Sequence, residues 1–284
     1  MNNKRVIARI QGGIGNQLFS YAGAYALARD LGYLLYLDNL SYEIGYFRKN
    51  RLLEFNIAFD GIIKHPVSPK MHFKLQQICP PKGIYEKQPY VYQDILENAR
   101  EYPYRDVYLS GYWQSERYFK KYRNELLYMF QSKDSAATQF IDSFFEKNHY
   151  RNTVAVHVRR GDFVTGGCAL KPSFYFQAIE EMNSRVDDPE YIFFTDDKQF
   201  TKDFFNIENV SNYSMFEMET NDDIVELMCM AACKNQISSN SSYAWWGAWL
   251  KKNDNPQIIV PLMPYLSDTD YYPKHWKTIV AEKE

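Results

Sequence analysis

Short apolar runs alternate with amphipathic stretches along the second half of the chain, and this alternation predicts its fold. Apolar runs bounded by turn residues indicate strands, and apolar residues that recur every three or four positions indicate helices. The expected strands cover residues 154–158, 191–194, 213–216, 236–238 and 257–260. The expected helices cover about 172–185, 198–205, 220–233 and 243–251. Strands that alternate with helices in this way form a parallel, doubly wound α/β sheet.

The first residues of the chain show the same pattern once. A strand at Val6–Ile10 is followed by a glycine-rich turn at 11–17, a helix at Leu18–Leu31 and a strand at 34–37 that ends at Asp38. Residues 41–103 carry several prolines and only short apolar runs, which predicts irregular structure with small helices. A strand at 107–110 and helices at about 115–130 and up to about 147 complete this half. The polar segment 148–152 then predicts two domains, 1–150 and 151–284.

The glycine-rich turn near the N-terminus leaves three interpretations open. Gly13 and Gly15, with Asp38 after the next strand, imitate the fingerprint of dinucleotide-binding folds. The third glycine of that fingerprint would fall at Leu18, which weakens the match. The turn can instead keep Asn16 and Gln17 open to a ligand, or it can be a tight turn between strand and helix.

Composition excludes several classes of protein. The chain of 284 residues has 33 basic and 35 acidic residues and a net charge of −2, which argues against a nucleic-acid-binding protein. The four cysteines have no disulfide-like spacing, which fits a reducing compartment. No signal peptide and no apolar run long enough to span a bilayer is evident. We expect a cytoplasmic protein, with a peripheral contact at the cytoplasmic face of a membrane left open.

The strand at 154–158 leads into a loop that is dense in charge. Alternation along the strand puts His157 and Arg159 on the same face, and Arg160, Gly161 and Asp162 follow at its carboxyl end. Such an edge of a parallel sheet is a candidate anion site. The alternative is an ion pair between Arg160 and Asp162 that only closes the end of the strand.

Two more polar loops follow strands in this half, at residues 195–197 and 238–242. Parallel strands end at one edge of a sheet, so all three loops should meet there and form a nucleotide site. An arginine can fork onto a phosphate, and serines and backbone N–H groups at a helix start can complete the cradle. An aspartate can accept two hydrogen bonds from a guanine edge.

Four motifs give the chain a family resemblance. The segment from His157 to Asp162 resembles the HxRRxD motif of the fucosyltransferase superfamily. The segments 12–19, 111–116 and 239–247 resemble those of the α-1,2-fucosyltransferases of glycosyltransferase family 11. The motifs occur in order over almost the whole chain, which makes the set more specific than any single motif. The N-terminus resembles that of the bacterial members.

The resemblance implies an α/β, GT-B-like fold in which two Rossmann-like domains face a central cleft. Domain 1–150 would lie on the acceptor side and domain 151–284 would bind GDP-fucose, with a tail that can pack back on the first domain. The implied reaction moves L-fucose from GDP-β-L-fucose, with inversion, to the 2-hydroxyl of a galactose-containing glycan. No metal and no further cofactor are implied, because a fixed cation can neutralise the leaving diphosphate.

The same resemblance suggests roles for single residues. Arg159 would bind the β-phosphate, His157 would contact the nucleotide and Arg160 would orient the loop. Asp162 is the candidate base, unless it is an ion-pair partner of Arg160. The remaining candidates for contacts with the donor or acceptor are Asp196 and Asp197 at the guanine or ribose, Ser239, Asn240, Ser241 and Ser242 at the phosphates, and Gly13, Asn16 and Gln17 from the first domain.

Two other functions stay open at this point. One is an NAD(P)-dependent oxidoreductase built on the glycine-rich turn. The other is a non-catalytic carbohydrate-binding protein with the same fold. The sequence Asp268-Thr269-Asp270 has the form of a metal-binding motif of glycosyltransferases, but it lies in a proline-flanked tail and is interpreted as surface.

Overall fold

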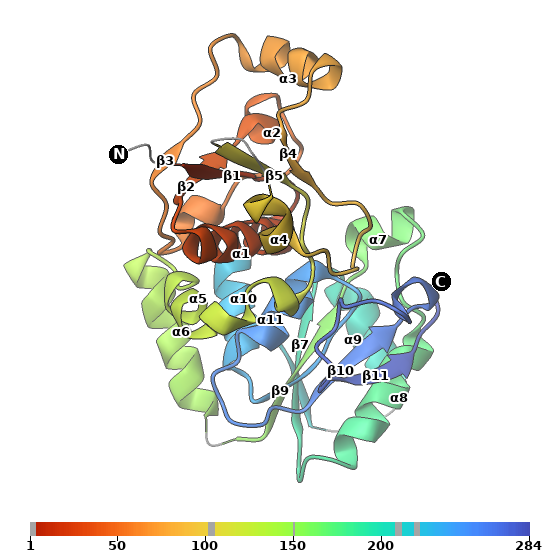
Figure 1. Cartoon of the computed structure of the whole chain (residues 1–284). Helices are drawn as coiled ribbons and strands as arrows, with labels where there is room; N and C mark the ends of the chain where they lie inside the picture. Colours follow the sequence, from red (N-terminus) through yellow and green to blue (C-terminus); the bar gives the residue numbers. More distant parts are fainter. Residues whose placement is uncertain (1–3, 102–105, 150, 208–211, 219–221) are drawn as a thin grey trace. The chain divides into compact units, whose positions relative to one another are not determined.

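The computed structural model describes residues 4–101, 106–149, 151–207, 212–218 and 222–284. The chain forms two compact units (Figure 1). Unit 1 consists of Met1–Gln131 and Asp268–Pro273, and unit 2 of Ser132–Ser267 and Lys274–Glu284. Helix α6 (Ser135–Asn148) therefore packs in unit 2, although the sequence boundary at 150 assigned it to the first half.

Unit 1 is built on a parallel sheet with the strand order β3-β2-β1-β5-β4. Helix α1 (Ile14–Leu31) starts four residues earlier than predicted and is buried on almost every side. The predicted helix 115–130 is instead two 3₁₀ turns followed by α5 (Arg123–Met129). The other elements are β1 (Arg5–Arg9), β2 (Leu34–Asp38), α2 (Leu40–Glu43), β3 (Gly61–Ile62), α3 (Pro69–Ile78), β4 (Gly83–Tyr85), α4 (Ile95–Arg100) and β5 (Asp106–Ser110).

Unit 2 contains a second parallel sheet, with the strand order β11-β10-β9-β6-β7-β8. Its strands are β6 (Thr153–Val158), β7 (Glu190–Thr195), β8 (Tyr213–Met215), β9 (Asn235–Ile237), β10 (Ile258–Leu262) and β11 (Lys277–Val280). Its helices besides α6 are α7 (Gly161–Thr165), α8 (Pro172–Asn183), α9 (Lys198–Ile207), α10 (Asp223–Ala232) and α11 (Ser242–Trp249). Two parallel α/β sheets, each in its own unit, confirm the GT-B-like fold.

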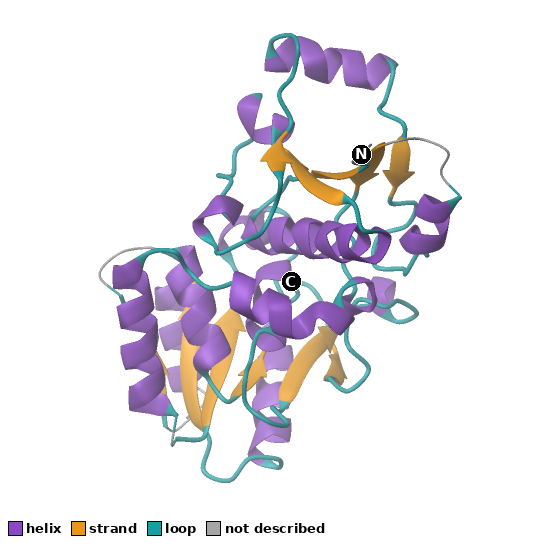
Figure 2. Ribbon diagram, turned by 60° about the vertical axis from the view of Figure 1, so that its left-hand side comes forward, coloured by secondary structure: helices purple, strands orange, loops and turns teal. Residues whose placement is uncertain are grey.

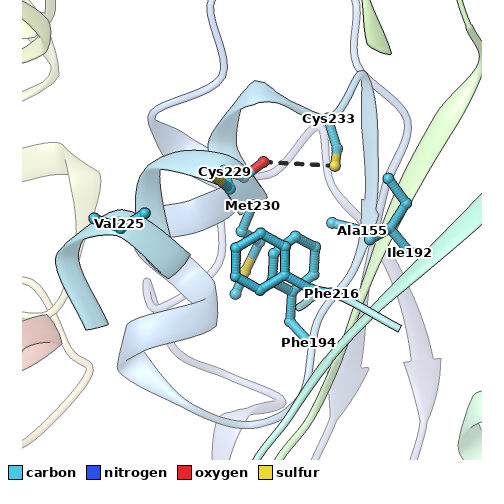
Figure 3. Packing of buried hydrophobic residues seen from close by; sticks show 8 residues of the cluster. All are labelled: Ala155, Ile192, Phe194, Phe216, Val225, Cys229, Met230 and Cys233. Atoms are coloured by element: carbon cyan, nitrogen blue, oxygen red, sulfur yellow. Dashed lines mark hydrogen bonds between the residues drawn. The ribbon is translucent and has the colours of Figure 1, made fainter. Parts of the chain in front are cut away.

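Helices cover both faces of the sheet in unit 2 (Figure 2). On one face, α6 and α10 pack on the cluster in Figure 3, which consists of Ala155, Ile192, Phe194, Phe216, Val225, Cys229, Met230 and Cys233. On the other face, the Tyr191 hydroxyl donates to the Ile179 carbonyl oxygen of α8 at 3.3 Å. Alternate residues of β6 and β7 are therefore buried on opposite sides of the sheet. Cys229 and Cys233 are free thiols that are buried in the core.

Unit 2 differs from the sequence prediction at β11 and at the cap of α10. Strand β11 was not predicted, because three of its four residues are exposed and its sequence lacks an apolar run. The predicted cap of α10 at Thr220 or Asn221 lies outside the described residues, and the observed cap is Asp222, whose carboxylate accepts from the Ile224 N–H at 2.8 Å. None of the helices in the described ranges has the length and apolarity that crossing a membrane would need.

Lys251 links the end of α11 to the end of α10. Its side chain is 1% exposed, and its ammonium donates to the carbonyl oxygens of Met230 at 2.7 Å and Cys233 at 2.8 Å. A cation at a helix C-terminus is favourable because the last carbonyl groups have no partner within the helix. Burial lowers the pKa of Lys251 to about 8, while the nearby Cys233 opposes that shift.

We expect Lys251→Met to lower the free energy of unfolding by about 2 kcal/mol at pH 7, because two buried carbonyl groups lose a charged donor. The folded-state pKa lies below the ordinary value of 10.5. The folded protein therefore binds fewer protons than the unfolded chain above pH 8, and the contribution of Lys251 to stability rises with pH there. Urea unfolding at pH 7 and pH 9.5 checks both points. Equal stability of variant and wild type at both pH values would contradict them.

Candidate nucleotide-binding site

The three polar loops of unit 2 lie at one edge of its sheet. Strand β6 pairs with β9 on one side and with β7 on the other, and both pairings are parallel. The loops that follow these strands carry residues 159–162, 196–197 and 238–241. The sequence prediction that these segments come together is confirmed.

Arg159 lies between two carboxylates at this edge. Its Nη2 donates to Asp162 Oδ1 at 2.7 Å, and its Nη1 lies 2.9 Å from Asp196 Oδ2. Only 26% of the Arg159 side chain is exposed. These charge-assisted contacts hold the planar guanidinium in one orientation. Asp162 therefore pairs with Arg159, and the predicted alternative of an Arg160–Asp162 pair is wrong.

Arg160 contacts other residues, in the C-terminal segment and at the start of α9. Its Nη1 donates to Glu284 Oε1 at 2.5 Å, its Nε lies 3.5 Å from Asp197 Oδ2, and its guanidinium carbon is 3.4 Å from the ring centre of Phe200. The C-terminal segment reaches this position because the Glu284 N–H donates to the Ala169 carbonyl oxygen at 2.9 Å. Arg160 thus ties the loop after β6 to α9 and to the C-terminal segment.

Gly161 is required by the close approach of Asp196. The Asp196 carboxylate accepts from the Arg160 backbone N–H at 2.7 Å, and a Cβ on Gly161 would lie 2.7 Å from Asp196 Oδ2. Gly161 was expected to form a tight bend. In the structure Gly161 starts α7, and glycine is needed there because a side chain would displace the carboxylate that holds Arg159.

His157 is buried and neutral. Its Nδ1 lies 2.8 Å from the Ser239 hydroxyl oxygen, and its ring centre lies 5.6 Å from that of Tyr243. Burial, with a smaller effect of the Arg159 charge, lowers the pKa of His157 to about 3. A neutral imidazole has one donor and one acceptor nitrogen, so His157 can link Ser239 to a further polar group.

The loop after β9 opens helix α11. Ser241 caps this helix by accepting from the Tyr243 N–H at 3.2 Å, and Ser242 is its first residue. Asn240 Nδ2 donates to the Cys168 carbonyl oxygen at 3.0 Å. Among the predicted phosphate contacts, Ser239 and Ser241 thus have structural roles, while the N–H groups of the first turn of α11 present a partial positive charge.

Asp196 and Asp197 both stabilise the loop after β7. Asp196 Oδ1 accepts from the Arg160 backbone N–H, and Asp196 Oδ2 pairs with the Arg159 guanidinium. Asp197 Oδ1 accepts from the Phe200 N–H at 3.1 Å and so starts α9. A contact with guanine or ribose stays a prediction, and Asp197, with 40% of its side chain exposed, is the better placed of the two.

The predicted residues of unit 1 lie at the start of α1. Gly12 has φ +84°, which favours glycine, whereas a Cβ on Gly13 would meet no atom within 4 Å. Asn16 Oδ1 accepts from Gln114 Nε2 at 2.9 Å.

The expectation that Gln17 faces a ligand is wrong. Its side chain is fully buried, and its amide bonds the carbonyl oxygens of Gly12 and Lys49 and the N–H groups of Arg51 and Leu52. Gln17 therefore holds the segment at 49–52 against α1.

Three acidic residues near this edge were missed by the sequence analysis. Asp222, Asp223 and Glu226 lie in the cap and first turn of α10, and no strand directly precedes them. Glu226 is close enough to Asp196 and Arg159 for their charges to act on it, and burial is the main reason why its pKa is raised to about 7. The raised pKa of Glu226 could not be predicted from composition or motif spacing, because it depends on how far folding removes the side chain from water.

The described residues contain no group of three His, Cys, Asp or Glu side chains that could hold a metal ion. The segment Asp268-Thr269-Asp270 instead stabilises unit 1 through contacts of Asp270. Asp270 accepts from Arg117 Nη1 at 2.7 Å and from the Tyr92 N–H at 3.0 Å.

Comparisons with known proteins cover nearly the full chain. The model of the family described as "Glycosyl transferase family 11" matches residues 3–280. The chain is 28% identical to an alpha-1,2-colitosyltransferase of Escherichia coli over 96% of its length and 98% of that protein. It is 27% identical to the O-antigen biosynthesis glycosyltransferase WbnK of Escherichia coli, over 89% of this chain and 92% of that one.

Among solved structures, the fold is similar to that of the fucosyltransferase NodZ from Bradyrhizobium. The TM-score is 0.53 at 17% identity, with 86% of this chain and 91% of that chain covered. FUT1 of Arabidopsis thaliana, in complex with GDP, gives a TM-score of 0.53 at 9% identity, over 91% of this chain and 70% of that chain.

The half-buried carboxyl group of Glu226 gives a pH-dependent prediction. Its folded-state pKa of about 7 lies above the ordinary value of 4.5. The folded protein therefore binds more protons than the unfolded chain between these values, and stability due to this group is lost as the pH rises through that window. We expect Glu226→Gln to gain up to about 3 kcal/mol in unfolding free energy, relative to wild type, between pH 4.5 and pH 8.

Thermal or urea unfolding at both pH values measures that difference. Glu180→Gln, on the exposed side of α8 in the same unit, is the matched control and should behave like wild type. A Glu226→Gln variant whose stability follows the wild type at every pH would show that the side chain is solvated in solution.

Proposed function

Since the chain belongs to glycosyl transferase family 11, we propose that it transfers L-fucose from GDP-β-L-fucose to the 2-hydroxyl of a galactoside with inversion. The observation that carries the donor class is the position of Arg159, which is fixed by two carboxylates at the carboxyl edge of a parallel sheet. The relatives named as a colitosyltransferase and as a putative galactoside 2-alpha-L-fucosyltransferase support the α-1,2 linkage.

Arg159 would bind the diphosphate of the donor. Two of its N–H groups point to Asp162 and Asp196, and a guanidinium has five N–H donors in all, so donors remain for phosphate oxygens. The N-terminus of α11, next to Ser241 and Ser242, would add backbone N–H groups. Fixed donors of this kind stabilise the charge that grows on a leaving diphosphate.

The proposed reaction is a direct displacement. The acceptor hydroxyl oxygen forms a bond to C1 of the fucosyl group while the bond from C1 to the β-phosphate oxygen breaks, and GDP leaves. The proton of the hydroxyl passes to a base. Asp162 is our candidate, because its carboxylate is exposed and bonded to the cation that holds the leaving group.

Donor identity has a second candidate. Colitose is the 3-deoxy analogue of L-fucose, and one relative is named an alpha-1,2-colitosyltransferase. A GDP-linked 3-deoxy sugar would use the same phosphate contacts, so the two donors differ only in contacts near C3. The NAD(P)-dependent oxidoreductase has no such support, since Leu18 occupies the place of the third glycine and is fully buried.

The experiment that tests the function supplies GDP-fucose or GDP-colitose together with a panel of galactosides. We expect GDP release that depends on the acceptor, and a product whose α-1,2 linkage is read by NMR. Excess EDTA should leave the rate unchanged.

Asp162→Asn should keep GDP binding and lose turnover. If this variant still turns over, another residue is the base. Binding of fucosylated glycans without any GDP release would favour the non-catalytic alternative.

Arg159→Lys should weaken GDP binding about 10- to 100-fold, because lysine keeps the charge but loses the fork. Isothermal titration calorimetry with GDP measures this loss. Arg151→Lys is a matched control, since Arg151 precedes β6 at its opposite end and pairs with Glu190. Equal losses in both variants, or no loss in Arg159→Lys, would remove the phosphate role.

A further inference from the structure

Helix α3 of unit 1 carries three large apolar residues on its outside. Met71, Leu75 and Ile78 are four and three residues apart, so they form one stripe along the helix. Their exposed fractions are 53%, 48% and 83%. No described residue of α3 is buried. Figures 1 and 2 both show that the helix projects from the rest of unit 1 and is joined to it by extended segments.

The opposite side of α3, with His72, Phe73 and Gln76, is half-buried and packs inward. The ring of His72 lies 4.1 Å, centre to centre, from that of His65, and Gln76 Nε2 lies 3.2 Å from His72 Nε2. His65 Nε2 in turn lies 3.2 Å from Asp38 Oδ1, and Asp38 is 1% exposed. Contacts that start from a buried carboxylate therefore fix the rotation of α3. This rotation leaves the apolar stripe outside.

The segment that carries the stripe contains lysines but no acidic residue, whereas the charges of Asp38 and Glu43 act on His72 at the inward side of α3. Residues 61–85 contain four lysines (Lys64, Lys70, Lys74 and Lys82) and no aspartate or glutamate, although the whole chain has a net charge of −2. Lys70 and Lys74 lie on α3 beside the stripe, and both are exposed. Ile62 and Val67, at 38% and 40% exposure, are two more exposed apolar residues in the segment before the helix. An exposed apolar stripe next to lysines is the pattern of helices that lie in a membrane interface.

We propose that the exposed side of α3, with Met71, Leu75 and Ile78 and the flanking Lys70 and Lys74, docks unit 1 on an anionic lipid bilayer. The apolar stripe would enter the boundary between headgroups and acyl chains, and Lys70 and Lys74 would face anionic headgroups. Lys70 and Lys74 beside the stripe favour a surface of high negative charge density. The stripe follows one side of a single straight helix, which fits a plane. The proposal does not depend on the transfer reaction, because it needs neither donor nor acceptor.

Flotation of the full chain with vesicles tests the proposal. We expect binding to vesicles of phosphatidylcholine with 30% phosphatidylglycerol, a much weaker interaction with pure phosphatidylcholine, and release in 0.5 M NaCl, because salt screens exposed charges. Lys70→Gln with Lys74→Gln should lower the partition coefficient about 30-fold. Met71→Gln with Leu75→Gln and Ile78→Gln should lower it by about a hundredfold or more.

The control variant is Tyr128→Gln with Val280→Gln, which removes two apolar side chains that are each 70% exposed and lie outside 61–85. It should bind vesicles like wild type, and the unfolding temperature of every variant should match the wild type. Wild-type protein that stays in the vesicle-free fraction, or a triple variant that still floats, would overturn the proposal. So would sedimentation that shows a dimer dissociated by the triple variant, because the stripe would then be a contact between two copies.

Discussion

The contact on which the site depends is the pairing of one guanidinium with two carboxylates. Arg159 lies between Asp162, three residues later in the same loop, and Asp196, which follows the neighbouring strand. The parallel pairing of β6 with β7 brings the two loops together. Gly161 leaves the space that the Asp196 carboxylate occupies. Strand register, a glycine and an acidic loop thus act together to place one side chain.

This arrangement has a cost and a benefit for anion binding. Two carboxylates more than neutralise Arg159, so the local group is not a simple positive site. The guanidinium is in return held in one rotamer before a ligand arrives, and fixed donors lose little freedom when they bind. Positive potential must also come from the helix end at Ser242 and from Lys198, whose charge, like that of Arg159, acts on Glu226. The raised pKa of Glu226 fits this view, because a protonated carboxyl group adds no further negative charge.

Sequence reasoning predicted the part of the site that depends on periodicity. Strands β6, β7 and β9 were expected within two residues of their observed bounds, and their shared edge follows from parallel pairing. Side-chain partners were harder to predict. Gln17 looked available beside glycines, but its amide holds the segment at 49–52. The outward stripe of α3 was missed because a helix has the same apolar period whether its apolar side faces the core or the outside. Only the contacts of His72 show which side of α3 faces inward.

The most direct test is a crystal structure of the protein with GDP, in which the distance from the Arg159 guanidinium to the nearest diphosphate oxygen is measured. The account predicts a charge-assisted hydrogen bond of about 2.7–2.9 Å, with the Asp196 pair still in place. A diphosphate that lies beyond the reach of Arg159, or that a divalent ion holds in its place, would contradict it.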